Sequence, residues 1–324
     1  MEDSAQKQIT RKQHIVPQSY LRRFATLTEN GNYQIGVGIR KKDGHGFSAA
    51  TQSVKNVGYI KDFYEFDCRK DIPNYWENYF AEVIEPFCGT ELSNIIRKIE
   101  SSQNTAVVLS HEDKCNLSVF ICHQIFRSPQ ALEKALQIGQ KSIAESKRKA
   151  QIYFNESFSP FLQPFLLDAL NRANFTNDEI KDVAMQSMSN VSKQEERIDA
   201  LLNKTWLVYE NQTQLQFITS DNPVCRRNCV TNSFSFEENT LKDSNSIILF
   251  PLSPTILIEI TPSHLLGSQP QKYDGRKFLL GQNDLSFIAG TDTLQMLQCH
   301  RQIFMSLNTL QHLDELSKAS KIND

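Results

Sequence analysis

The chain has 324 residues, of which 40% are hydrophobic and 22% are charged, and its formal net charge at pH 7 is −2. This composition is ordinary for a globular protein, and the length suffices for a large core in one or two domains. The small net charge excludes a strongly basic nucleic-acid coat protein, but it leaves a local basic patch open. The longest apolar runs, such as Ile247 to Phe250, fall short of the roughly 18 residues that a membrane helix needs.

The N-terminal segment MEDSAQKQITRKQH is polar and lacks the apolar region of a secretory signal peptide. The seven cysteines are an odd number spread over a large chain, which favours reduced thiols over a disulfide framework. Cys225 and Cys229 could form half of a zinc site, but no second Cys or His pair of suitable spacing follows. We therefore predict a cytoplasmic protein with no membrane association.

The first third of the chain carries one short helix, one strand and the start of a longer helix. We predict that residues 1–12 form a mobile leader and that a short helix runs from Pro17 to Ala25, because proline suits a first helical position. From Tyr33 to Ile39, apolar residues alternate with small or polar ones, which predicts a strand. An apolar stripe at helical spacing follows Pro73, and Pro86 is expected to kink or end that helix.

The middle of the chain is predicted to be helical. Two capping boxes mark helix starts, and another helix begins at Pro129 and extends to Phe154. The boxes are Ser110 with Asp113, which opens a helix through Ile125, and Thr176 with Glu179, which opens one long helix through Leu202.

The last third changes to the period of two that is typical of strands. Two hairpins separated by a polar loop are predicted, followed by a helix and a final strand. The segments are 206–209 with 215–218, 247–250 with 255–260, the loop 231–246, the helix from Asn283 to about Gln298, and the strand from Gln302 to Met305. Because no repeat or strong linker is visible, we predict one α+β domain over residues 13–312 and a polar tail over 313–324. In that domain, a helix-rich layer packs on a mostly antiparallel sheet built largely from the C-terminal third.

The densest group of polar residues lies in QHIVPQSYLRRF, from Gln13 to Phe24. His14 precedes the short helix and could act as a general base or a metal ligand, because imidazole titrates near neutral pH. Tyr20 and Arg23 lie about one turn apart on that helix and could contact a substrate. The alternative is that the helix only packs against the core while His14 bonds a backbone carbonyl.

Two further segments place polar residues at the ends of apolar elements. In FITSDNPV, Asp221 could bind a metal or orient His14, with Asn222 beside it, although Asp-Asn before proline is also a common turn. In HQIFRSP, Gln124 and Arg127 share one face near a helix end. Arg127 could hold a phosphate or carboxylate, or it could bond the last carbonyls of its own helix.

Three carboxylates, Glu77, Glu82 and Glu85, follow one another in the helix after Pro73. Glu82 and Glu85 could share a face that binds Mg²⁺ or Mn²⁺, although a solvated helix surface is the commoner outcome. No Gly-rich phosphate loop, G-x-S-x-G or H-E-x-x-H motif is present. The string HIVP is only faintly similar to the opening of an HNH nuclease motif, whose Asn and second His do not follow at a recognisable spacing.

The same segments resemble a largely bacterial family known as domain of unknown function 4238. The matching strings are QHIVPQSYLRRF, DFYEFD around Tyr64, HQIFRSP and FITSDNPV, and their order and spacing fit over most of the chain. The resemblance implies a common fold, supplies no activity, and suggests that residues from separate segments converge. The shared positions that it implies are His14, Pro17, Tyr20, Gln124, Arg127, Asp221 and Asn222.

Two hypotheses follow. In the first, the protein is a nuclease-like hydrolase of phosphodiesters, such as a toxin or defence effector, with His14 as base and Arg127 as phosphate clamp. Asp221 is then a metal ligand or orienter, and Glu85 a second ligand of Mg²⁺ or Mn²⁺. In this hypothesis nucleic acid or another phosphoester is the ligand, and the residues that bind it are Tyr20, Arg23, Gln124 and Asn222. In the second, the protein is a non-enzymatic binding module whose polar residues are buried and brace the helical layer against the sheet.

Overall fold

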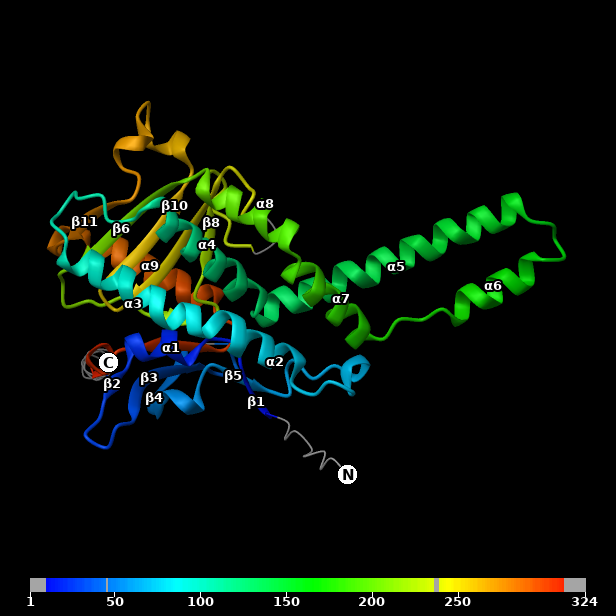
Figure 1. The fold of residues 1–324 in the computed structure, drawn as a ribbon, viewed down its shortest axis with the longest axis horizontal. Helices are drawn as coiled ribbons and strands as arrows, with labels where there is room; N and C mark the ends of the chain where they lie inside the picture. The colour runs from blue at the N-terminus through cyan, green and yellow to red at the C-terminus, as the bar shows by residue number, and fades with distance from the viewer. Residues whose placement is uncertain (1–9, 45, 236–238, 312–324) are drawn as a thin grey trace, which may run out of the picture.

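The computed structural model describes residues 10–44, 46–235 and 239–311 (Figure 1). The predicted tail and most of the predicted leader lie outside these residues. The fold is α+β, as predicted, with helices packed on mostly antiparallel sheets. No helix in the described part of the chain combines the length and the hydropathy that crossing a membrane requires.

One sheet is built from the last third of the chain and has the strand order β11-β6-β10-β9-β8. Neighbouring strands in this sheet are antiparallel, except that β11 runs parallel to β6. The whole of β9 is buried, because Ile248 and Phe250 belong to the main core on one face while Ile247 and Leu249 belong to a smaller core on the other. The strands are β6 Thr205–Asn211, β8 Cys225–Asn228, β9 Ser246–Ser253, β10 Ile256–Thr261 and β11 Arg276–Leu280.

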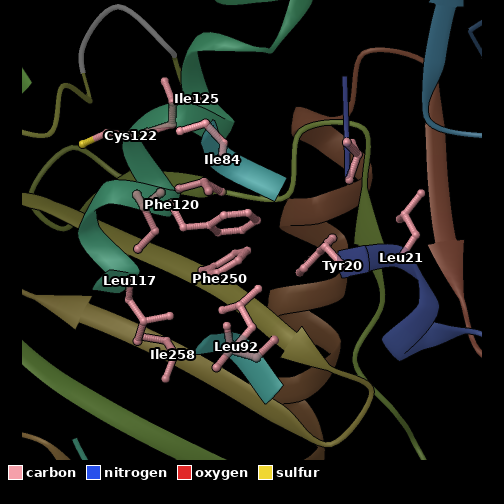
Figure 2. Close-up of a cluster of buried hydrophobic side chains, with 14 of the residues drawn as sticks. Tyr20, Leu21, Ile84, Leu92, Leu117, Phe120, Cys122, Ile125, Phe250 and Ile258 are labelled. Carbon is pink, nitrogen blue, oxygen red and sulfur yellow. The ribbon is translucent and has the colours of Figure 1, made fainter. Parts of the chain in front are cut away.

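Helices cover both faces of this sheet. On one face lie α3 (Glu85–Ser101) and α4 (His111–Phe126), and on the other lies α9 (Leu285–Gln298) (Figure 1). Figure 2 shows the main core, in which Leu117 and Phe120 from α4 meet Phe250 of β9. The predicted capping box of Ser110 and Asp113 opens α4 and fixes where this helix starts.

The N-terminal strands join β7 and β12 in a second sheet, so the predicted C-terminal sheet is only part of the β structure. Its order is β2-β3-β12-β7, with β4 also pairing with β3, while β1 and β5 form a separate pair. Gly36 and Gly38 face Met305 and Ile303 across the β3–β12 pair, where a Cβ atom at either glycine would lie under 3.0 Å from those side chains. The strands are β1 Lys12–His14, β2 Thr26–Leu27, β3 Tyr33–Arg40, β4 Phe47–Ser53, β5 Tyr59–Lys61, β7 Thr219–Ser220 and β12 Gln302–Met305.

Two predicted elements were wrong. The long helix predicted after Thr176 is two helices, α7 (Asn177–Ser189) and α8 (Val191–Leu202), because the Asn190 side chain caps a new helix start. The predicted hairpin of 206–209 with 215–218 is absent from the described fold, because β10 and β11 occupy the two edges of β6. Residues 215–218 instead form an extended loop, in which the N–H of Ile218 donates to Asp292 Oδ1.

The remaining helices include a long arm. Helix α5 (Pro129–Ser157) projects from the body and returns through α6 (Gln163–Arg172) (Figure 1). Before α3, α2 (Tyr75–Tyr79) passes directly into a π-helical turn, η4 (Phe80–Ile84). The short helices are α1 Gln18–Leu21, η1 Arg22–Phe24, η2 Val54–Asn56, η3 Asp67–Arg69, η5 Ser263–Leu266, η6 Pro270–Lys272 and η7 Gln282–Asp284.

Candidate functional site

The segment that carries His14 is held by backbone pairing. His14 is the last residue of β1 and lies opposite Tyr59 of β5. The next two N–H groups both donate to the carbonyl of Gly58, and Pro17 then opens α1. The imidazole is therefore attached to a backbone whose position is fixed on both sides.

The imidazole of His14 is uncharged at neutral pH. Burial, together with the positive charges of Arg127 and Lys12, lowers the pKa of His14 to about 4. The amide nitrogen of Gln18 lies 3.2 Å from Nε2 of His14 and can donate to it. A neutral imidazole of this kind can accept a proton or bind a polar ligand.

Arg127 lies at the C-terminal cap of α4, and its side chain is only 1% exposed. Its Nη2 donates to the backbone carbonyl of His14 and lies 3.4 Å from Oε1 of Glu85. Its guanidinium carbon stands 4.5 Å from the ring centre of Phe80. The Nε and Nη1 groups are buried and have no partner among the described residues. A buried cation with two unused donors is suited to hold an anion.

The π-helical turn brings two carboxylates toward Arg127. In a regular α-helix, Glu77 and Glu85 would lie about 80° apart around the axis. The π-helical turn between them inserts roughly one residue and removes most of that angle. Pro86 favours this wider turn because it has no N–H to offer the preceding turn. Glu82 is exposed to solvent, and the predicted pairing of Glu85 with Glu82 stays a prediction.

Glu77 is a site residue that the sequence-based assignment of roles did not include. Burial raises the pKa of Glu77 to about 7, and the charge of Arg127 and the backbone N–H of His14 only partly oppose the rise. Its Oε2 is buried and has no hydrogen-bond partner among the described residues. A carboxyl group with this pKa exchanges its proton near neutral pH, which is the property of a general acid or base.

Other parts of the matching strings surround this cluster. Gln13 is fully buried, and its Nε2 donates to Oε1 of Glu65 at 2.6 Å. The Nε2 of Gln124 donates to the carbonyl of Ile15 at 2.8 Å, while the Tyr64 hydroxyl lies 3.5 Å from the carbonyl of Arg127. The DFYEFD string was the signal for Tyr64 and Glu65, although neither residue was predicted as part of a site.

Asp221 lies in a separate network at the start of β12. Its Oδ1 accepts from the N–H of His300 at 2.7 Å, and its Oδ2 accepts from the N–H groups of Arg301 at 2.7 Å and Gln302 at 2.8 Å. Burial raises the pKa of Asp221, and these three bonds oppose the rise. None of the hydrogen bonds or ion pairs among the described residues joins Asp221 to His14 or Arg127. The closest link runs through Gln302, whose Oε1 accepts from the N–H of Gly58 at 3.1 Å.

The other predicted ligand contacts are directed toward protein groups. The Tyr20 hydroxyl donates to the carbonyl of Pro251 at 2.6 Å. The Nδ2 of Asn222 donates to the carbonyl of Gln298 at 3.1 Å. Arg23 donates to the Ser93 hydroxyl of α3 at 3.0 Å. These bonds suit a bracing role, and substrate binding by Tyr20, Arg23 and Asn222 stays a prediction.

Metal binding also stays a prediction. Within residues 10–44, 46–235 and 239–311, no three His, Cys, Asp or Glu side chains gather into a group that could hold a metal ion. Glu85 contacts Arg127, and both oxygens of Asp221 accept backbone N–H groups. Cys225 and Cys229 are free thiols, as are the other cysteines that the structure describes.

The raised pKa of Glu77 predicts a pH effect on stability. A carboxyl group whose pKa is about 7 in the folded protein, against an ordinary value of 4.5, destabilises the fold progressively as pH rises from about 4.5 to 7. Glu77→Gln mimics the protonated form. Its free energy of unfolding, relative to that of the wild type, should therefore rise by roughly 2 kcal/mol as pH increases from 5 to 8, after allowance for solvent screening. Thermal melts over this range measure the difference. Glu82→Gln, at an exposed position on the same turn, should show none, and a pH-independent difference for Glu77→Gln would contradict the assignment.

Comparison with known proteins gives one match. A family described as "Protein of unknown function (DUF4238)" matches residues 12–307, which include every residue of the cluster around Arg127. No curated protein and no solved structure matches the chain.

Proposed function

The chain belongs to the DUF4238 family, whose description gives no activity, and we propose from the site itself that the protein is a hydrolase of phosphodiesters. The observation that carries the proposal is the buried guanidinium of Arg127, with two unused donor nitrogens, beside Glu77 and His14. A site with a fixed cation, a carboxyl group that titrates near pH 7 and an uncharged imidazole has the parts of acid–base hydrolysis of an anion.

In the proposed reaction, Arg127 binds the non-bridging oxygens of the phosphate through its free N–H groups. The imidazole of His14 accepts a proton from the attacking water as the water oxygen bonds to phosphorus. The bond from phosphorus to the leaving oxygen breaks, and the protonated carboxyl of Glu77 supplies the proton that this oxygen takes up. Pairs of groups whose surroundings separate their pKa values are typical of such acid–base roles.

We also propose that Glu85 could hold Mg²⁺ or Mn²⁺, although the hydrolysis steps do not require an ion. Oε1 of Glu85 lies 3.4 Å from Nη2 of Arg127, and carboxylate oxygens are the ligands that these ions prefer. The hydrolysis steps given above use only side chains of the chain, so they predict some activity in the presence of a chelator.

The bonding of Asp221, Tyr20 and Gln124 favours a second candidate, a binding module without catalysis. All three side chains bond backbone groups of distant segments and are almost fully buried. In this candidate, the cluster at Arg127 fixes the N-terminal segment to α4 and presents a surface to a partner.

Substitution of His14 separates the two candidates. His14→Ala should lower the rate of phosphodiester cleavage by about 10²–10⁴-fold, because a general base contributes that much, while the melting temperature stays close to that of the wild type. The substrates are single-stranded RNA, single-stranded DNA and bis(p-nitrophenyl) phosphate, each with EDTA, Mg²⁺ or Mn²⁺.

His264→Ala is the matched control, because His264 is exposed in η5. An inert wild type, together with a His14→Ala variant destabilised by about 1–3 kcal/mol, would reject the hydrolase and leave the binding module.

A further inference from the structure

Two cavities adjoin along the inner part of α5, away from the cluster around Arg127. The first, of about 470 Å³, lies among α4, α5, α8 and residues 240–242, and the second, of about 590 Å³, lies between α5 and α7. They share Ala135, Ile138 and Met188 in their linings, so they form one continuous groove, called here the α5 groove. Each part has the size of a small-molecule site.

The α5 groove is apolar along most of its length. Its walls in the first cavity include Phe126 and Leu241, and in the second Ile143, Ile180 and Val183. Binding of an alkyl chain in such a groove removes the chain from water, which contributes about 0.8 kcal/mol to the binding free energy for each buried CH₂.

The two ends of the α5 groove differ in charge. Four cationic residues and no acidic residue line the first cavity. Glu179 is the acidic residue of the second cavity, and its carboxylate is used in the capping box that opens α7. The groove is therefore apolar along its length and has cationic groups at one end, where Lys242 is already paired with Glu196 and the two arginines supply the remaining fixed charge. The four cationic residues are Lys134, Arg197, Arg226 and Lys242.

Hydrogen bonds to backbone carbonyls hold two arginine side chains in place at the positive end. Arg226 is only 5% exposed, and its Nη1 donates to the carbonyl of Asn239 at 2.8 Å. Arg197 stands 4.5 Å from the ring centre of Phe126 and donates to the carbonyl of Met188 at 3.4 Å. In the part of the chain that the structure describes, no carboxylate forms an ion pair with Arg197. A half-buried guanidinium held on an aromatic ring can still offer its other N–H groups to a carboxylate.

We infer that the α5 groove binds a single-chain amphiphile with a carboxylate head, of the fatty-acid class. The head lies at Arg197, and the alkyl chain follows α5 past Ile138 toward Ile180. This ligand matches both features of the groove, since its charge is confined to one end and the rest of it needs no hydrogen bonds. The inference does not depend on the proposed hydrolysis, because no residue of the cluster around Arg127 lines the groove.

Binding of 11-(dansylamino)undecanoic acid to the full chain, followed by fluorescence, tests the inference. Dodecanoate should displace this probe at a concentration about tenfold lower than dodecanol, because only the carboxylate interacts with Arg197. Arg197→Gln should remove this difference by weakening dodecanoate alone. Ile138→Glu should weaken both competitors, and its side chain is 57% exposed, so the fold tolerates the change.

Arg148→Gln is the control for charge, because Arg148 is exposed farther along α5 and lines neither cavity. Its affinity for dodecanoate should equal that of the wild type. Equal displacement by dodecanoate and dodecanol, or displacement that neither Arg197→Gln nor Ile138→Glu changes, would overturn the inference. Circular dichroism of each variant shows whether a loss of binding comes from a loss of fold.

Discussion

Asp221→Ala is expected to unfold at a temperature roughly 5 °C below that of the wild type, which is the largest stability loss that we predict. The carboxylate accepts three backbone N–H groups that begin β12, and it is itself 2% exposed. Alanine leaves all three donors without an acceptor in a buried position, at a cost of about 1–3 kcal/mol for each unsatisfied group. Partial rescue by water would bring the total to roughly 3–5 kcal/mol, which for a chain of this size shifts the melting temperature by several degrees.

Two variants make this result interpretable. Asp221→Asn retains one acceptor oxygen but turns an NH₂ group toward the remaining donors, so its loss should be intermediate. Asp199→Ala removes an exposed aspartate from α8 and should melt like the wild type. A melting temperature for Asp221→Ala within about 1 °C of the wild type would mean that the three bonds contribute little, and a ligand role for Asp221 would then gain support.

Arg127→Lys is expected to lower kcat/KM for the best phosphodiester substrate by about 10²–10³-fold, the usual loss when a fixed group that stabilises a transition-state charge is removed. Lysine can still place a charge near the His14 carbonyl and Glu85, so the fold should persist with a modest loss of stability. It cannot present a planar fork of N–H groups to two oxygens, which is what the free Nε and Nη1 of Arg127 offer.

A second measurement on Arg127→Lys does not require turnover. Inorganic phosphate should raise the melting temperature of the wild type in a saturable way, because a ligand that binds only the folded state stabilises it. The same addition should have no such effect on Arg127→Lys. Arg97→Lys, at an exposed position of α3, should keep both the activity and the response to phosphate. Equal responses of all three proteins would place anion binding elsewhere.

The elements that the sequence predicted well are those whose signals are local. The strand from Tyr33 and the helix opened by Ser110 and Asp113 are specified by residues within a few positions of each other. The second sheet was missed because its pairing joins β3 to β12, at opposite ends of the chain. The hairpin predicted around residues 211–213 failed for the same reason, since distant β11 takes the edge of β6 that the prediction gave to 215–218.

The same division holds for the candidate site. Arg127 contacts the backbone of His14, and these residues belong to two strings, HQIFRSP and QHIVPQSYLRRF, that the family resemblance suggested would converge. The contribution of Glu77 could not be read from spacing, because an ordinary helix would turn it away from Glu85, and the π-helical turn reverses that. Asp221 was predicted from its position after an apolar segment, yet its bonding partners come from a backbone about 80 positions later, which no local pattern indicates.

The pairing of β3 with β12 also constrains how the chain is made. A ribosome adds about 5–20 residues per second, so β3 is complete tens of seconds before β12 is synthesised. During that interval β2 and β4 can pair with β3, but the edge that receives β12 has unpaired N–H and C=O groups. Gly36 and Gly38 lie in the part of β3 that pairs with β12, and they carry no charged side chain that would discourage pairing with another strand. A nascent chain therefore carries an open strand edge through most of translation, and a chain that ends before Gln302 never closes it.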